Sequence, residues 1–168
     1  LIFYVLKKTV PGPLMAKANL LLDSLQRFFE QPENMEKLKD ILEHRKGISL
    51  RNLEWFVTNY ARERHVTYQT QSGRPFTVHV AYKSSLDGYS KKLFDPFCRT
   101  DRIDFHGFTT TPAQLNFLRW CFQNGIVDYM IKTRVLLDHR QSQKSHSRNK
   151  TCSEKTRTEF EEHTAQET

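Results

Sequence analysis

The chain has 168 residues, of which 38% are hydrophobic and 12% aromatic, enough to bury a single core. Its formal net charge of +7 favours contact with nucleic acid or another polyanion. Three cysteines without regular spacing and the lack of a long apolar run argue against a disulfide scaffold and a membrane-spanning protein, and they predict an intracellular setting.

Helical spacing dominates the N-terminal part of the chain. Apolar residues three and four positions apart predict an amphipathic helix over residues 14–31. Pro32, at a first helical position, predicts a second helix over 32–44, antiparallel to the first. Because the first methionine is Met15, residues 1–14 are treated as an uncertain N-terminal extension.

A third helix is predicted to follow Ser49, which is a good N-cap residue. Its apolar stripe faces the core, which places Trp55 on the opposite side of the helix. Arg51 and Arg62 share that side, so it is both aromatic and cationic.

The middle of the chain changes from helical to strand-like spacing. Apolar and polar residues alternate on both sides of Gly73, which predicts a β-hairpin whose second strand begins at Pro75 and runs to about Tyr82. The following stretch is expected to be irregular, with one short strand over 102–108.

Two further helices and a polar tail are predicted at the C-terminal end. Thr111 is expected to cap a mostly buried helix, and a final helix is expected after Gly125. Residues 140–168 are polar, so we expect a disordered tail. The predicted fold class is α+β: a mostly helical single domain over 15–139 with a central β-hairpin.

The segment 82–105 mixes aromatic and cationic side chains and is the candidate binding surface. Rings can stack on bases, and ammonium or guanidinium groups can contact phosphates. The resulting hypothesis is a basic module that binds DNA or RNA without sequence specificity. The candidate nucleic-acid-binding residues are Lys83, Lys91, Lys92, Arg99, Arg102, Tyr89, Trp55, Arg51 and Arg62. In the competing interpretation the rings pack inward and the cations are solvated.

Three other functions remain open at this point. The same aromatic segment would suit a virion structural protein or an adaptor that docks onto another protein. Four aspartates, Asp87, Asp95, Asp101 and Asp104, lie near Lys91 and Lys92 in sequence. Metal-dependent nucleases use these residue types, although the spacing here matches no known pattern. The two C-terminal helices admit a helix-turn-helix interpretation, which the apolar start of the second helix disfavours. No cofactor, metal site or catalytic residue is predicted, and the oligomeric state is open.

Residues 47–131 resemble uncharacterised proteins of the nucleocytoplasmic large DNA viruses, the giant viruses. The most distinctive pieces are "WFVTNY", "YSKKLFDPFCR" and "QLNFLRW". The resemblance implies a viral origin, either directly or through a viral sequence integrated in a host genome. It also implies action inside the host cell, in the cytoplasm, a virus factory or the virion, and it implies no activity.

Overall fold

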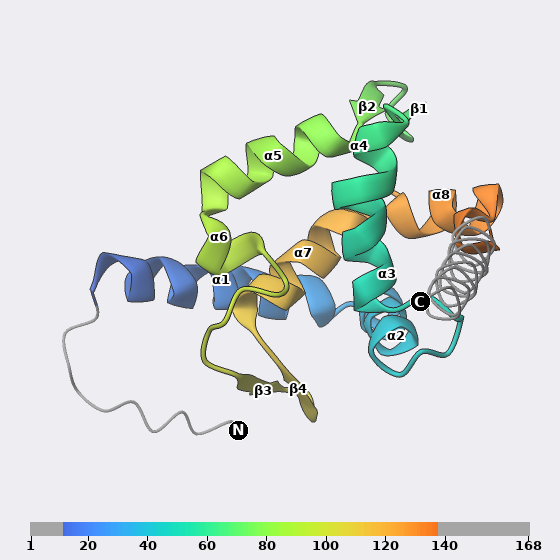
Figure 1. Ribbon diagram of the computed structural model, residues 1–168. Coiled ribbons are helices and arrows are strands. Elements are labelled where there is room, and N and C mark those ends of the chain that lie inside the picture. The colour runs from blue at the N-terminus through green and yellow to red at the C-terminus, as the bar shows by residue number, and fades with distance from the viewer. Residues whose placement is uncertain (1–11, 138–168) are drawn as a thin grey trace, which may run out of the picture. The chain divides into compact units, whose positions relative to one another are not determined.

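The computed structural model in Figure 1 describes residues 12–137 of the chain. The chain divides into two compact units, Leu1–Val127 and Asp128–Thr168. The helices and strands are α1 (Pro13–Phe29), α2 (Pro32–Leu42), α3 (Leu50–Trp55), the π-helical turn η1 (Phe56–Tyr60), α4 (Ala61–Glu63), β1 (Thr67–Gln69), β2 (Pro75–Thr77), α5 (Val78–Tyr89), α6 (Lys91–Phe94), β3 (Ile103–Phe105), β4 (Phe108–Thr110), α7 (Pro112–Gln123) and α8 (Ile126–Thr133).

This element order confirms the predicted fold class, because helices dominate and the described strands form two small antiparallel pairs. The tail predicted over 140–168 lies outside the described residues. So does most of the predicted extension, although α1 already begins at Pro13. The domain bounds of 15–139 stay a prediction.

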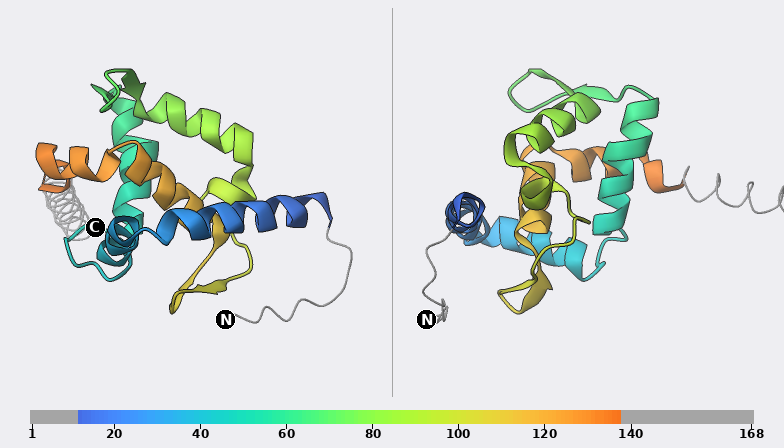
Figure 2. Two further views of the ribbon diagram at one scale, coloured as in Figure 1. Left: turned by 180° about the vertical axis from the view of Figure 1, so that it is seen from behind. Right: turned by 60° about the vertical axis from the view of Figure 1, so that its left-hand side comes forward.

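Helix α7 forms the centre of the first unit. It contacts α1, α2 and α6. In the right-hand view of Figure 2, α7 lies between α1 and the helix that contains α3 and α4. As the sequence predicted, α7 is capped by the Thr111 hydroxyl, which accepts a hydrogen bond from the Gln114 backbone N–H at 3.1 Å. Most of its surface is covered, at Ala113, Leu115, Asn116, Phe117, Leu118, Arg119 and Cys121.

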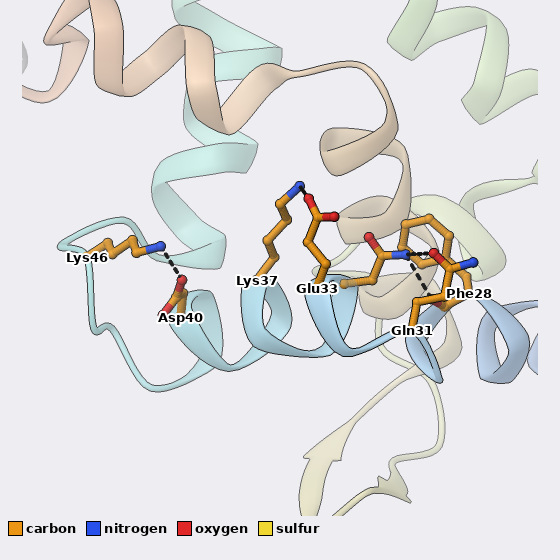
Figure 3. Close-up of polar contacts among 7 residues, drawn as sticks. Phe28, Gln31, Glu33, Lys37, Asp40 and Lys46 are labelled. Atoms are coloured by element: carbon orange, nitrogen blue, oxygen red, sulfur yellow. Dashed lines mark hydrogen bonds and ion pairs between the residues drawn. The ribbon is translucent and has the colours of Figure 1, made fainter.

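Helices α1 and α2 both form, but they meet at a tight corner and are not antiparallel as predicted. In the right-hand view of Figure 2, α1 is seen end-on while α2 runs across the picture. The side-chain amide of Asn34 donates to the Phe28 carbonyl at 2.9 Å, which satisfies one of the last carbonyls of α1 (Figure 3). Most charged groups on α2 are paired as well, since Lys37 contacts Glu33 at 2.9 Å and Lys46 contacts Asp40 at 2.6 Å.

The third predicted helix is one continuous helix, made of α3, η1 and α4. It starts with a capping box in which Ser49 and Asn52 each accept a hydrogen bond from the other's backbone N–H, at 3.2 and 2.9 Å. Its apolar stripe is buried at Leu53, Phe56, Val57 and Ala61, as the spacing predicted.

The hairpin is shorter than predicted. β1 pairs with β2, with Tyr68 opposite Phe76, but the second strand ends at Thr77. The Tyr68 hydroxyl donates to the Asn124 carbonyl at 2.6 Å and so fixes the hairpin to the end of α7.

The prediction of a strand to Tyr82 followed by an irregular stretch is therefore wrong, because residues 78–89 form helix α5. In a strand, Val78, Val80 and Tyr82 would share one face. In the structure Val78 and Tyr82 are buried one helical turn apart, while Val80 is 64% exposed.

Residues 103–110 form a second hairpin instead of the single predicted strand. The turn residues His106 and Gly107 have φ values of 51° and 84°. Positive φ at both central residues is the geometry of a type I′ turn, whose twist suits a two-residue hairpin loop. His106 also lies 3.1 Å from the Gln26 side-chain amide, so this hairpin contacts α1.

Candidate nucleic-acid interface

The candidate residues lie on four elements and one loop of the first unit. Lys83 and Tyr89 are on α5, and Lys91 and Lys92 are on α6. The loop between α6 and β3 carries Arg99 and Arg102, while Arg51 and Trp55 are on α3 and Arg62 is on α4. All seven cations are exposed, as is Tyr89, and Trp55 is half-buried. Figure 1 shows α5 and α6 following each other along one side of the first unit, with the loop continuing below α6.

Most rings of the segment 82–105 pack inward, as the competing interpretation held. Tyr82, Phe94 and Phe105 are buried, whereas Tyr89 and Phe97 are 41% and 42% exposed. Stacking on a ligand is therefore restricted, within this segment, to Tyr89 and Phe97. The sequence could not separate the two groups, because burial of Tyr82 and Phe94 depends on contacts with Phe117 and Trp120 of the distant helix α7.

Tyr89 is held against the core by Phe94. The two ring centroids are 5.7 Å apart and the planes differ by 13°, which is a stacked arrangement. Because Phe94 is fully buried, the face of the Tyr89 ring that contacts it is turned towards the core.

Phe97 is held by contacts on both its backbone and its ring. The Asp95 carboxylate accepts a hydrogen bond from the Phe97 backbone N–H at 3.0 Å. The guanidinium carbon of Arg51 lies 4.9 Å from the centre of the Phe97 ring, a cation–π contact. This contact joins the start of α3 to the loop after α6, so Arg51 lies beside the segment that carries Arg99.

Arg62 lies apart from that contact. It follows Arg51 by eleven residues on one continuous helix, which at ~1.5 Å per residue places it about 16 Å further along the axis. Trp55 contacts Tyr60 with ring centroids 5.6 Å apart and is only half-buried, which leaves its assignment a prediction.

Within residues 12–137, only one of the candidate cations has a carboxylate neighbour. Lys91 approaches Asp95 at 3.9 Å. Among residues 12–137 no ion pair involves any of the other candidate cations, namely Arg51, Arg62, Lys83, Lys92, Arg99 and Arg102.

A buried polar network, which the sequence did not reveal, fixes α6 in place. The side-chain amide of Asn116 donates to the Leu93 carbonyl at 2.9 Å. Arg119, only 9% exposed, donates to Asn116 at 3.0 Å and to the Ser24 hydroxyl at 2.6 Å. The network thus ties α6, with its two lysines, to α7 and α1. An Asn–Arg pair three residues apart within an apolar helix is the signal that could have indicated it.

Tyr82 lies beneath the candidate surface, and the pKa of its hydroxyl is strongly raised. Burial is the main cause that raises its pKa to about 12, and the negative charges of Asp95 and Glu54 add to the effect. Burial also raises the pKa of the Cys121 thiol well above its usual value, which agrees with a small core-filling side chain.

Two of the four carboxylates considered for a nuclease, Asp95 and Asp104, have structural partners. Asp95 accepts from Phe97, and Asp104 accepts a hydrogen bond from the Gly107 backbone N–H at 3.3 Å in the β3–β4 turn. In the part of the chain that the structure describes, no group of three or more His, Cys, Asp or Glu side chains is placed to hold a metal ion.

Among residues 12–137, no helix has the length and apolar character needed to cross a bilayer.

The fold and surface define a mostly helical α+β domain with a largely unpaired set of exposed cations. The chain belongs to a family of unknown function, DUF7197, whose model matches residues 14–168. It is 35% identical, over 124 residues, to the uncharacterized protein L507 of Acanthamoeba polyphaga mimivirus. That match covers 66% of this chain and 48% of the relative, so the chain spans about half the length of the protein it matches.

The mimivirus relative confirms the resemblance to an uncharacterised giant-virus protein. It supports a viral origin and assigns no activity. No solved structure matches the chain.

Proposed function

We propose that this domain binds nucleic acid, DNA or RNA, without sequence specificity. Lys83, Lys91 and Lys92 would contact phosphates from α5 and α6. Arg99, Arg102 and Arg51 would extend the contact along the adjoining loop. Arg62 and Trp55 would be peripheral contacts further along the third helix. Action on viral nucleic acid inside an infected cell, in a virus factory or in the virion, would fit the mimivirus relative.

The observation that supports this proposal is that, in the described part of the chain, six of the seven candidate cations have no carboxylate partner. Within residues 12–137, Lys91 alone of the candidate cations is paired with an acid, and that ion pair is long, at 3.9 Å. A cation already paired with a carboxylate has less to gain from a phosphate, whereas an exposed unpaired cation exchanges only loosely held counterions. Their positions on neighbouring elements allow several phosphates to be contacted at once.

The proposal is tested by measuring affinity for a labelled oligonucleotide over a range of salt concentrations. Contacts with about five phosphates of a single strand would give a slope of roughly −3 to −4 in log affinity against log salt. Absence of binding at low salt, or an affinity that does not change with salt, would rule the proposal out.

A protein-docking role is the second candidate, because some apolar side chains are exposed outside the cationic segment. Leu20 on α1 is 72% exposed, and Val80 on α5 is exposed as well. Purification from infected cells with and without nuclease digestion separates the two roles. Partners that remain bound after digestion favour docking, and partners lost on digestion favour nucleic-acid binding.

A further inference from the structure

Tyr89 and Phe97 share a property that the cations alone do not explain. Each residue is about two-fifths exposed, and each ring has a neighbour that lies against it. Tyr89 is stacked on Phe94, and Phe97 lies under the Arg51 guanidinium. The rings therefore have little side-chain freedom left to lose when a ligand stacks on them, which lowers the entropic cost of binding.

The two rings also lie close together along the chain, with the lysines between them. Lys91 and Lys92 fall between Tyr89 and Phe97 in sequence. The ring of Tyr89 contacts that of Phe94. Phe97 follows Phe94 by three positions, so the Cα atoms of Phe94 and Phe97 are at most about 11 Å apart. Two stacking rings and two ammonium groups thus lie within reach of one short oligonucleotide.

We infer that this surface selects single-stranded nucleic acid over duplex. This inference rests on the proposed function. In a duplex the faces of the bases are covered by neighbouring base pairs, so an exposed ring on the protein has no face to stack on. In a single strand each base can turn out and stack on an aromatic side chain, while its phosphates remain available to lysine and arginine.

The contribution of each ring can be separated from that of the charges. Stacking of one base on an aromatic side chain changes affinity by roughly five- to a hundredfold when the ring is removed. Tyr89→Leu and Phe97→Leu remove a ring but keep an apolar side chain and the net charge. Tyr89→Phe and Phe97→Tyr keep the ring and serve as matched controls.

The experiment measures affinity at one low salt concentration for a single-stranded oligonucleotide and for a duplex of the same length. The wild-type chain is expected to bind the single strand more tightly. Each leucine variant should lose at least fivefold on the single strand and less than twofold on the duplex. The ring-retaining variants should stay within about twofold of wild type on both probes.

The possible failures are distinguishable. If the wild type binds both probes equally and the leucine variants change neither, the inference is overturned while the proposed function stands. An equal loss of affinity for both probes would also overturn the inference, because the ring would then support binding in general and would not stack on unpaired bases. If neither probe binds at low salt, the proposed function itself fails. Thermal unfolding of each variant checks that the fold is retained.

Discussion

Two regions of the first unit differ in their balance of basic and acidic residues and in how many of their cations are ion-paired. Residues 12–46, which contain α1 and α2, have six basic and six acidic side chains. Half of those basic residues are ion-paired: Lys37 with Glu33, Lys46 with Asp40, and Arg45 with both Glu36 and Glu43. Residues 51–102 have nine basic and five acidic side chains. Among the described residues, Lys91 alone of these nine is ion-paired.

The difference in ion pairing affects the binding of a polyanion more than it affects the stability of the fold. Exposed ion pairs typically contribute between about 0 and 1 kcal/mol to folding, so the paired region gains little stability from its pairs. What pairing changes is the field around the molecule: a neutralised lysine attracts a polyanion weakly, whereas unpaired cations on adjacent elements add up. The contrast between residues 12–46 and 51–102 therefore locates the proposed binding surface.

The largest expected effect comes from removing the same number of charges from each region. Changing Lys83, Lys92, Arg99 and Arg102 together to Gln should weaken binding to a single strand at low salt by roughly a hundredfold or more, because four phosphate contacts are lost. Changing Lys17, Lys37, Arg45 and Lys46 to Gln removes the same net charge and serves as the control. Equal losses in the two variants would show that only total charge matters.

The next prediction concerns the network that holds α6 on the core. Asn116→Leu leaves the Leu93 carbonyl and the Arg119 guanidinium without their buried partner, which should cost about 2–4 kcal/mol in the free energy of unfolding. Arg119→Met replaces the buried charge with an apolar side chain and should cost less than the Asn116 variant. Denaturant unfolding measures both. A near-wild-type free energy for Asn116→Leu would contradict the role given to this network.

The raised pKa of Tyr82 predicts a loss of stability at high pH. Its pKa is about 12 in the folded chain and near 10 in the unfolded chain, so the folded state holds the proton more tightly. The associated stability is fully present below pH 10 and is lost as the pH rises towards 12. By linkage the loss amounts to roughly 2–3 kcal/mol.

Unfolding measured across that pH range, together with the ultraviolet absorbance of tyrosinate, tests this prediction. Tyr82→Phe should remove the part of the high-pH loss of stability that Tyr82 causes. In the absorbance titration, the same variant should lack one tyrosine that ionises at high pH. An unchanged decline in the Phe variant would assign the effect to another group.

The smallest effect is expected at the start of α3, which carries Arg51. Ser49→Ala removes the hydroxyl that accepts from Asn52 and should cost about 1 kcal/mol in the free energy of unfolding. Ser49→Thr, which keeps a capping hydroxyl, should retain most of the stability. A Thr variant no better than Ala would mean that the cap contributes little here.

Features set by local spacing could be predicted from the sequence. The existence of α1 and α2, the Ser49 and Thr111 caps and the buried character of α7 all follow from patterns within one helix. Residues 78–82 could not be assigned from local spacing, because Val-His-Val-Ala-Tyr fits both an alternating strand and a helix with residues 78 and 82 on one face. Packing on α7 decides between the two.

The sequence predicted which segment carries the candidate surface, but not which of its side chains are exposed. Composition pointed to residues 82–105, but which rings face outward depends on Phe117 and Trp120, far away in the chain. The Arg51–Phe97 contact likewise joins residues 46 positions apart and has no local signal. Which cations bind a ligand stays a prediction.

The most direct test compares salt dependence across the two charge-matched variants. The slope of log affinity against log salt for a single-stranded oligonucleotide is measured for the wild type and for both four-residue variants. The variant at Lys83, Lys92, Arg99 and Arg102 should lose about 3 from the magnitude of the slope, close to 0.7 per phosphate contact, while the variant in residues 12–46 keeps the wild-type slope. Equal slopes in the two variants would contradict a binding surface confined to residues 51–102.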